Sequence, residues 1–241
     1  MWHEQRLAAD ARGSGLPAGA ASDVVEETFV LGGRTVRMLR PRDADAVLDD
    51  VLTEEDPADD RLPFWAELWP SGVALARALS GQPLAGRRVL ELGCGLGLVS
   101  VTAALAGAGV LAADQSPEAA AFAAANAAHN GVGLQTAVCA FAQPGPLLAG
   151  APWDLVVAAD VLYEPGNVPE LLWLLPRLVD DAGAVWLADP GRPMLERFLA
   201  GVDATGWRCE TFLGDPDTVT IYRLWRRARS GPPVERDRTG G

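Results

Sequence analysis

The chain has 241 residues, of which 49% are hydrophobic, and a formal net charge of −12 at pH 7. This length and composition suit one α/β domain with an N-terminal extension. The acidity disfavours a nucleic-acid partner, and no apolar run reaches the length of a membrane span. The N-terminus has no basic start followed by an apolar stretch, so we expect a cytoplasmic protein without a secretory signal. The three cysteines form no CxxC pair, and neither a disulfide framework nor a metal site is expected.

The N-terminal part of the chain divides into two segments. Residues 1–25 are rich in Ala, Gly, Ser and Pro and are predicted to be a flexible leader. Residues 26–61 begin with two β-rich runs around Gly32-Gly33, over 27–39, which predict a hairpin. The nine acidic residues of 43–60 follow without an arginine. They are either a solvated face or an acidic rim that attracts a cationic partner.

The main domain is predicted over residues 62–227. A helix is expected from Pro70 to about Gly81, and after it strands and helices alternate along the chain. The predicted strands are 88–92, 109–113, 134–138, 154–159 and 183–188, and the predicted helices between and after them are 96–107, 117–130, 167–179 and 193–204. This alternation predicts a parallel sheet with right-handed crossovers. Two alternating runs, WRCETFL and TVTIYRLW, predict a terminal hairpin on the sheet edge, and 228–241 is predicted to be an Arg-rich flexible tail.

A glycine-rich loop follows the first strand of this sheet, in the stretch VLELGCGLG from Val89 to Gly97. Ligands of parallel sheets bind beyond the carboxyl ends of the strands. A phosphate-binding P-loop is excluded because the chain contains no lysine. A dinucleotide fingerprint is disfavoured because its third glycine would fall on Leu98. The spacing is instead E-x-G-x-G-x-G.

This spacing resembles motif I of the class I S-adenosylmethionine-dependent methyltransferases. The resemblance implies a Rossmann-like fold: a seven-stranded, mostly parallel sheet flanked by helices, with a terminal antiparallel hairpin and here an N-terminal β-hairpin extension. It implies S-adenosylmethionine as cofactor, lying against the bare backbone of the loop, and Glu91 facing the methionyl ammonium directly or through water. The loop residues that would contact the cofactor are Gly93, Cys94, Gly95 and Gly97.

Three further residues are expected on the cofactor side. Asp114 ends the second strand, where its two oxygens can accept both ribose hydroxyls, with Gln115 beside it. The alternative is that Asp114 only caps the turn before the helix that starts at Ser116. Phe141 follows the third strand and either packs on the adenine or belongs to the core.

A second motif follows the fourth strand, at Asp160-Val161-Leu162-Tyr163. It resembles the DxxF/Y motif of the seven-β-strand protein lysine methyltransferases. The stretches LPFWAELWPSG (62–72) and LADPGRP (187–193) are similar to segments of the lysine methyltransferases that modify the electron transfer flavoprotein β-subunit. With gaps, the resemblance runs from about residue 60 to 200. It implies that Trp69 contacts the cofactor and that Ala159 lines its adenosyl side.

The resemblance also implies a substrate site. A lysine has an ordinary pKa near 10.4, so it must lose a proton before it accepts a methyl group, and desolvation favours that loss. Asp160 would hold and orient the amine, Tyr163 and Trp65 would wall its channel, and Glu164 would line the entrance. The structural alternatives are a loop-capping Asp160 and core roles for Trp65 and Trp69. A side-chain pair between Asp189 and Arg192 is expected to be structural.

The sequence therefore predicts a monomeric S-adenosylmethionine-dependent N-methyltransferase that acts on a protein lysine, with an electron transfer flavoprotein β-subunit or a similar protein as substrate and without nucleic-acid or membrane partners. Two alternatives remain open. One is a small-molecule amine or nicotinamide-type N-methyltransferase. The other is a catalytically inactive, cofactor-binding interaction protein.

Overall fold

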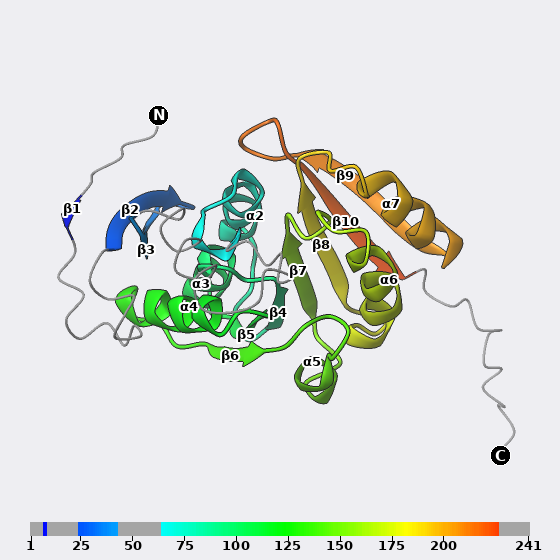
Figure 1. Cartoon of the computed structure of the whole chain (residues 1–241), viewed down its shortest axis with the longest axis horizontal. Coiled ribbons are helices and arrows are strands. Elements are labelled where there is room, and N and C mark those ends of the chain that lie inside the picture. The colour runs from blue at the N-terminus through cyan, green and yellow to red at the C-terminus, as the bar shows by residue number, and fades with distance from the viewer. Residues whose placement is uncertain (1–6, 9–23, 43–63, 227–241) are drawn as a thin grey trace, which may run out of the picture.

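The computed structural model of the chain describes residues 7–8, 24–42 and 64–226 (Figure 1). The leader, the acidic residues 43–60 and the tail 228–241 lie largely or wholly outside these ranges, and the predictions made for them stay predictions. The three boundaries between the four predicted segments also stay predictions. The smaller of the two sheets is antiparallel and consists of β1 (Leu7–Ala8), β2 (Val24–Leu31) and β3 (Arg34–Pro41).

The predicted hairpin is confirmed as β2 and β3. Its two-residue turn is Gly32-Gly33, and both glycines have positive φ, 56° and 79°. Two consecutive positive φ angles give the turn whose twist matches that of the flanking strands, and glycine adopts them without a steric penalty.

The larger sheet has seven strands in the order β6, β5, β4, β7, β8, β10, β9. The first five pair in parallel, whereas β10 is antiparallel to both β8 and β9. The strands are β4 (Arg88–Leu92), β5 (Gly109–Asp114), β6 (Gln135–Val138), β7 (Leu155–Ala159), β8 (Ala184–Asp189), β9 (Trp207–Leu213) and β10 (Thr220–Arg226). The predicted sheet, with its terminal hairpin at one edge, is confirmed.

Helices cover both faces of this sheet (Figure 1). Val89 and Leu90 are neighbours in β4, yet they belong to different hydrophobic clusters on opposite faces. Burial on both faces explains why these strands read as apolar runs rather than as alternating patterns. The helices on one face are α2 (Pro70–Ser80), α3 (Leu98–Leu105) and α4 (Pro117–His129); those on the other are α5 (Gly145–Ala149), α6 (Asn167–Leu178) and α7 (Leu195–Ala204).

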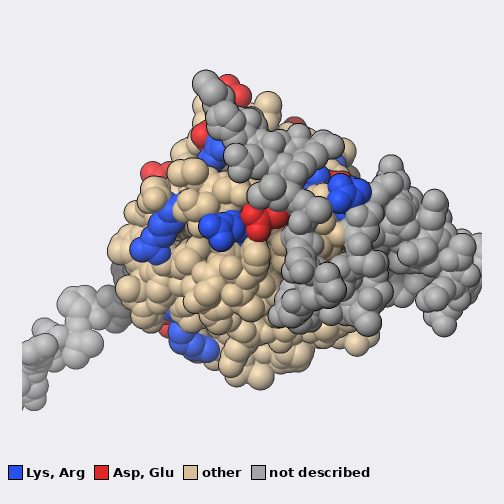
Figure 2. Space-filling view, turned by 90° about the vertical axis from the view of Figure 1, so that its left-hand side faces the viewer, with Lys and Arg blue, Asp and Glu red and all other residues tan. Residues whose placement is uncertain are grey.

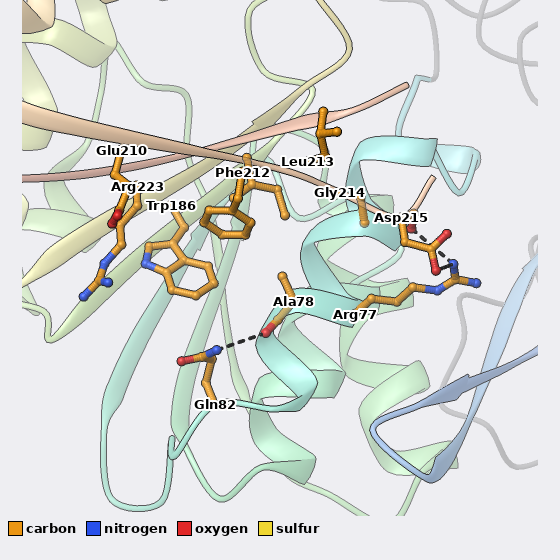
Figure 3. Close-up of a pocket in the computed structure, with 12 residues that line it drawn as sticks. Arg77, Ala78, Gln82, Trp186, Glu210, Phe212, Leu213, Gly214, Asp215 and Arg223 are labelled. Carbon is orange, nitrogen blue, oxygen red and sulfur yellow. Dashed lines mark hydrogen bonds and ion pairs between the residues drawn. The ribbon is translucent and has the colours of Figure 1, made fainter. Parts of the chain in front are cut away.

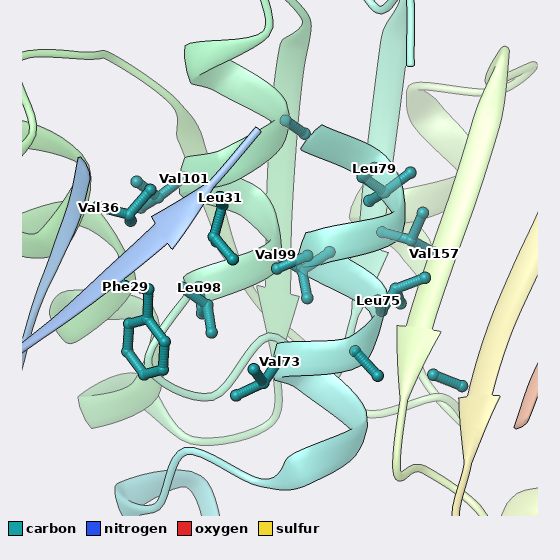
Figure 4. Close-up of a cluster of buried hydrophobic side chains, with 14 of the residues drawn as sticks. Phe29, Leu31, Val36, Val73, Leu75, Leu79, Leu98, Val99, Val101 and Val157 are labelled. Carbon is teal, nitrogen blue, oxygen red and sulfur yellow. The ribbon is translucent and has the colours of Figure 1, made fainter. Parts of the chain in front are cut away.

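The small sheet adds a third layer outside α3 and α4. Figure 4 shows side chains of β2 and β3, such as Leu31 and Val36, directed toward α3, where Leu98 and Val101 lie. The same cluster continues through α2 to Val157 of β7, so hairpin, helices and sheet share one core.

Two short helices had no counterpart in the sequence prediction, α5 and η2 (Phe64–Ala66). Each is too short to show a helical repeat of apolar residues. Within the described ranges, no helix combines the length and hydrophobicity needed to cross a membrane.

Candidate functional site

The glycine-rich loop connects β4 to α3. Its three glycines, Gly93, Gly95 and Gly97, all have positive φ, 68°, 49° and 84°. A Cβ on Gly97 would lie 2.8 Å from Cα and Cβ of Ala123 in α4, and one on Gly93 would lie 3.0 Å from Cγ1 of Val161. Conformation and space therefore both require glycine here. The backbone is left bare at the carboxyl end of β4.

The backbone of Trp65, in the segment before α2, lies against this loop. A Cβ on Gly95 would lie 3.3 Å from the backbone oxygen of Trp65. Trp65, from one of the sequence motifs, and the glycine loop, from another, are therefore neighbours in space.

Asp114 ends β5 beside the same loop. Its Oδ2 accepts a hydrogen bond from the Gly95 amide at 2.9 Å and its Oδ1 accepts one from the Ser116 amide at 3.0 Å. Ser116 itself caps α4, because its hydroxyl accepts from the Ala119 amide at 3.1 Å. Burial raises the pKa of the Asp114 carboxyl. Each carboxylate oxygen can accept a further hydrogen bond, so Asp114 fits the two hydroxyls of a ribose as well as its role in the turn.

Glu91 lies inside β4 and is only 2% exposed. Its Oε2 accepts a 2.8 Å hydrogen bond from the Ser100 amide and a second, shorter one from the Ser100 hydroxyl. Burial raises the pKa of Glu91 to about 8, against the opposing effect of the Ser100 bonds. A nearby ammonium would favour the ionised form, as the predicted contact with a methionyl ammonium requires. No sequence signal identified Ser100, because a serine near a helix start is common.

The other residues predicted to bind cofactor lie around these carboxyl ends. The Cys94 side chain is buried in a cluster with Ala112 and Ala123, and burial raises the pKa of its thiol well above the ordinary value. Gln115 is exposed, whereas Phe141 and Ala159 are half-buried against the two core clusters. Bare backbone, an accepting carboxylate and flanking apolar groups fit a nucleoside cofactor. The individual contacts stay predictions.

Asp160 follows β7 and is the one non-glycine residue with positive φ, 61°, in the described ranges. Its amide donates to the Ala188 oxygen of β8 at 2.9 Å, and its side chain is buried. Oδ1 accepts from Arg192 Nε at 2.6 Å and Oδ2 accepts from the Ser71 hydroxyl at 3.3 Å. These side-chain bonds join Asp160 to α2 and to the turn after β8, and neither of them goes to the N-terminus of α6, which begins at Asn167. The loop-capping alternative for Asp160 stays open.

The expected side-chain pair between Asp189 and Arg192 needs correction. Asp189 Oδ1 accepts hydrogen bonds from the backbone amides of Gly191 and Arg192, both at 2.7 Å. The carboxylate thus stabilises the turn that directly follows it in the chain. The Arg192 guanidinium reaches across to Asp160 on the neighbouring strand end instead.

Three aromatic rings form a group that contacts Arg192 through Trp69. The centroids of Phe64 and Tyr163 are 5.4 Å apart, and those of Phe64 and Trp69 are 6.2 Å apart, both edge to face. Trp69 Nε1 donates to the Phe64 oxygen at 2.7 Å, and the Arg192 guanidinium carbon lies 5.7 Å from the Trp69 ring. Phe64 and Tyr163 are 40% and 38% exposed, so this aromatic group presents a surface to solvent. Phe64 was not identified from the sequence.

The remaining predicted substrate residues are placed differently. The Trp65 ring packs against Phe122 of α4, with centroids 5.4 Å apart, as the structural alternative supposed, and its substrate role stays a prediction. Glu164 is exposed beside Tyr163. Burial, with a contribution from the charges of Glu164 and Asp114, raises the pKa of Tyr163 to about 12. Tyr163 is therefore a neutral hydroxyl at physiological pH.

A separate groove of about 510 Å³ lies between α2 and the strands β8, β9 and β10 (Figure 3). Trp186 and Phe212 form part of its wall, and the ion pair of Arg77 with Asp215, 2.5 Å long, lies at one end. None of the residues predicted for cofactor, substrate or catalysis lines it. The groove is thus separate from the candidate site, which lies at the carboxyl ends of β4, β5 and β7.

The face shown in Figure 2 carries its charged side chains in small, separate groups, with wide uncharged surface between them. No continuous charged patch is visible among the described residues of this face. The nine acidic residues of 43–60 lie outside the described ranges, so the acidic-rim alternative stays a prediction.

Three features together define a class I, Rossmann-like methyltransferase: the strand order of the large sheet, the glycine-rich loop after β4, and the acidic residues at the strand ends. A family model described as lysine methyltransferase matches residues 63–199, and the chain belongs to this family. Membership of this methyltransferase family confirms the prediction of S-adenosylmethionine as cofactor.

Individual relatives agree with this assignment. The electron transfer flavoprotein beta subunit lysine methyltransferase of Danio rerio is 37% identical over 138 residues, which cover 56% of this chain and 52% of that protein. Its Homo sapiens counterpart is 33% identical over 142 residues, covering 54% and 50%. The chain thus spans about half the length of the curated relatives it matches. The resemblance stated from the sequence motifs is confirmed.

Solved structures agree on the fold. The Thermus thermophilus 16S rRNA N2 G1207 methyltransferase, in complex with AdoMet and guanosine, is similar with a TM-score of 0.61 over 86% of this chain and 51% of that one. The sequence identity is 14%, so this similarity describes the fold alone.

Proposed function

We propose that this chain transfers a methyl group from S-adenosylmethionine to a lysine amine of a protein, and that its substrate is an electron transfer flavoprotein β-subunit or a similar protein. The observation that carries the proposal is the buried carboxylate of Asp160 at the strand end next to the glycine loop. Its partner Arg192 lies over Trp69, which belongs to an aromatic group with the partly exposed rings of Phe64 and Tyr163. The names of the relatives support the choice of a protein lysine. A monomeric state and a cytoplasmic location belong to the same proposal.

The cofactor, when bound, supplies an electrophilic methyl group on a sulfonium. The glycine loop and Asp114 would hold its nucleoside, with Glu91 toward the methionyl ammonium. The aromatic surface strips water from the arriving lysine, which favours its neutral form, and the released proton leaves to water.

Asp160 accepts an N–H of the amine and directs its lone pair toward the methyl carbon. Most of the acceleration then comes from the fixed alignment of nitrogen and methyl group. Aromatic faces also tolerate the positively charged methylated products. In this mechanism Asp160 orients the amine and does not act as a strong base.

The test is transfer of labelled methyl from S-adenosylmethionine to purified electron transfer flavoprotein β-subunit and, in parallel, to a cell extract separated into protein and small-molecule fractions. Asp160→Asn is the site variant. Asp154→Asn is its matched control. Asp154 precedes β7 at the amino end of the strand, opposite to Asp160, and its Oδ2 accepts a hydrogen bond from the Arg88 amide at 2.7 Å.

Label in one protein, lost in Asp160→Asn and kept in Asp154→Asn, supports the proposal. Label confined to the small-molecule fraction would favour a metabolite amine as substrate. Cofactor binding without any transfer would indicate an inactive interaction protein.

A further inference from the structure

The ion pair between Asp160 and Arg192 assigns different roles to the two oxygens of the Asp160 carboxylate. Oδ1 accepts a 2.6 Å charge-assisted bond from Arg192 Nε, whereas Oδ2 has only the 3.3 Å bond from the Ser71 hydroxyl. Charge-assisted bonds of the first kind are short and strong. Each oxygen keeps a free lone pair, but Oδ2 carries only the longer bond from a neutral hydroxyl and is therefore the better acceptor for another donor.

Three contacts hold Arg192 in position for this bond. The Asp189 carboxylate binds the amides of Gly191 and Arg192 and so fixes the turn that carries the guanidinium. Gly191 has φ of 93°, which a side chain would disfavour. The guanidinium carbon lies over the Trp69 ring at 5.7 Å, which adds a cation–π contact.

Arg192 interacts with the charges of two carboxylates at this point. Asp189 is 1% exposed, and its Oδ2 is a buried side-chain oxygen without a hydrogen-bond partner among the described residues. The Arg192 guanidinium forms its ion pair with Asp160, and its positive charge also acts on Asp189, so it offsets the negative charge of both. Without Arg192, the repulsion between these two carboxylates at neighbouring strand ends would not be compensated.

We propose that Arg192 is a positioning residue for methyl transfer: it fixes Asp160 through Oδ1 and leaves Oδ2 to orient the substrate amine. The inference rests on the proposed function. It assigns to Arg192 a role exerted through Asp160, without contact with the methyl group.

The first test is a double-mutant cycle on labelled methyl transfer to a protein acceptor, with Arg192→Gln, Asp160→Asn and the double variant. Arg192→Gln should lower kcat on the order of 100-fold, with the KM for the cofactor unchanged, because misplacement of a reacting group has effects of this size. In the Asp160→Asn background, Arg192→Gln should have no further effect, since both changes remove the same interaction.

Two variants separate this role from a merely structural one. Arg192→Lys should restore part of kcat, because it keeps the charge but lacks the planar Nε donor. Arg177→Gln is the matched control: Arg177 also stacks on a tryptophan, Trp173 at 4.0 Å, on the outside of α6. It should keep full activity. Additive effects of Arg192→Gln and Asp160→Asn, or wild-type kcat in Arg192→Gln, would overturn the inference.

A second readout does not depend on catalysis. With S-adenosylhomocysteine bound, n-butylamine is added as a lysine side-chain mimic, at constant ionic strength, while the ¹³C signal of the Asp160 carboxyl is followed by NMR. The wild type should respond and Arg192→Gln should not. A response in the wild type without methyl transfer to a protein would refute the proposed function, but it would still show that Arg192 sets Asp160 to bind an amine. An equal response in both proteins, or none in the wild type, would refute the inference.

Discussion

The side-chain amide of Asn126 brackets the backbone of Leu39: its Oδ1 accepts from the Leu39 amide at 2.6 Å and its Nδ2 donates to the Leu39 oxygen at 3.0 Å. The second hydrogen of the same Nδ2 goes to the oxygen of Leu96, at 2.9 Å, in the glycine loop. One fully buried side chain on α4 thus connects the N-terminal hairpin to the loop at the candidate cofactor site.

Asn126→Ala should lower the free energy of unfolding by ~3 kcal/mol, because it leaves buried backbone groups without partners. Asn130 makes the same pair of bonds to Arg37, but at an exposed position. Asn130→Ala should therefore cost only ~1 kcal/mol. Urea denaturation of both variants measures the free energy of unfolding. Equal losses in the two variants would show that burial of the pair of amide–backbone hydrogen bonds does not determine its contribution.

Gly97→Ala should destabilise the protein more than Gly131→Ala. Both glycines have positive φ, 84° and 71°, so both variants carry the backbone penalty. A Cβ at Gly97 meets Ala123 at 2.8 Å, whereas one at Gly131 meets nothing within 4 Å. The difference in unfolding free energy should be ~2 kcal/mol, the usual cost of overpacking. Thermal or urea unfolding of the two variants measures it, and similar stabilities would contradict the close contact.

Glu91 should make stability depend on pH. Its folded-state pKa, about 8, lies above the ordinary value of 4.5. Its contribution to stability is therefore fully present below pH 4.5 and is lost as the pH rises through 8. The unfolding free energy should fall by about 1 kcal/mol per pH unit within this window, and Glu91→Gln should abolish that part of the slope. Urea titrations between pH 5.5 and 8.5 test this; parallel slopes in both proteins would refute it.

Asp114→Ala should weaken binding of S-adenosylhomocysteine by about 10- to 100-fold, the loss expected for hydrogen bonds to a charged acceptor. Isothermal titration calorimetry measures the affinity. Asp154→Ala serves as control, because Asp154 also accepts a backbone amide but lies at the amino end of β7. A comparable loss in the control would point to a general effect on folding.

Phe64→Ala and Trp65→Ala should separate substrate binding from packing. Phe64 is partly exposed beside Tyr163, so its removal should raise the KM for the protein substrate and leave the melting temperature nearly unchanged. The Trp65 ring packs on Phe122, so Trp65→Ala should cost ~3 kcal/mol of stability. The reverse pattern would support the predicted role of Trp65 as a wall of the amine channel.

The fold and the cofactor half of the site could be predicted because local rules set them. Strands buried on both faces must be apolar runs, and a loop whose backbone takes positive φ at Gly93, Gly95 and Gly97 must carry glycine there. Asp114 could be identified because it is the last residue of a predicted strand. Each of these features can be recognised from the sequence, since it depends only on residues that are close together in the chain.

The substrate half was decided by tertiary structure. Arg192 and Asp160 are 32 positions apart, and Asn126 and Leu39 are 87 apart. The pairing of Arg192 with Asp160 rather than Asp189 depends on a turn that commits the Asp189 oxygen to backbone amides. Which of Phe64 and Trp65 packs inward depends on the short η2 turn. Sequence alone determined which chemical groups are available at the sheet edge; only the packing of adjacent strand ends decided which of them meet, because hydrogen bonds and ion pairs form between neighbours in space.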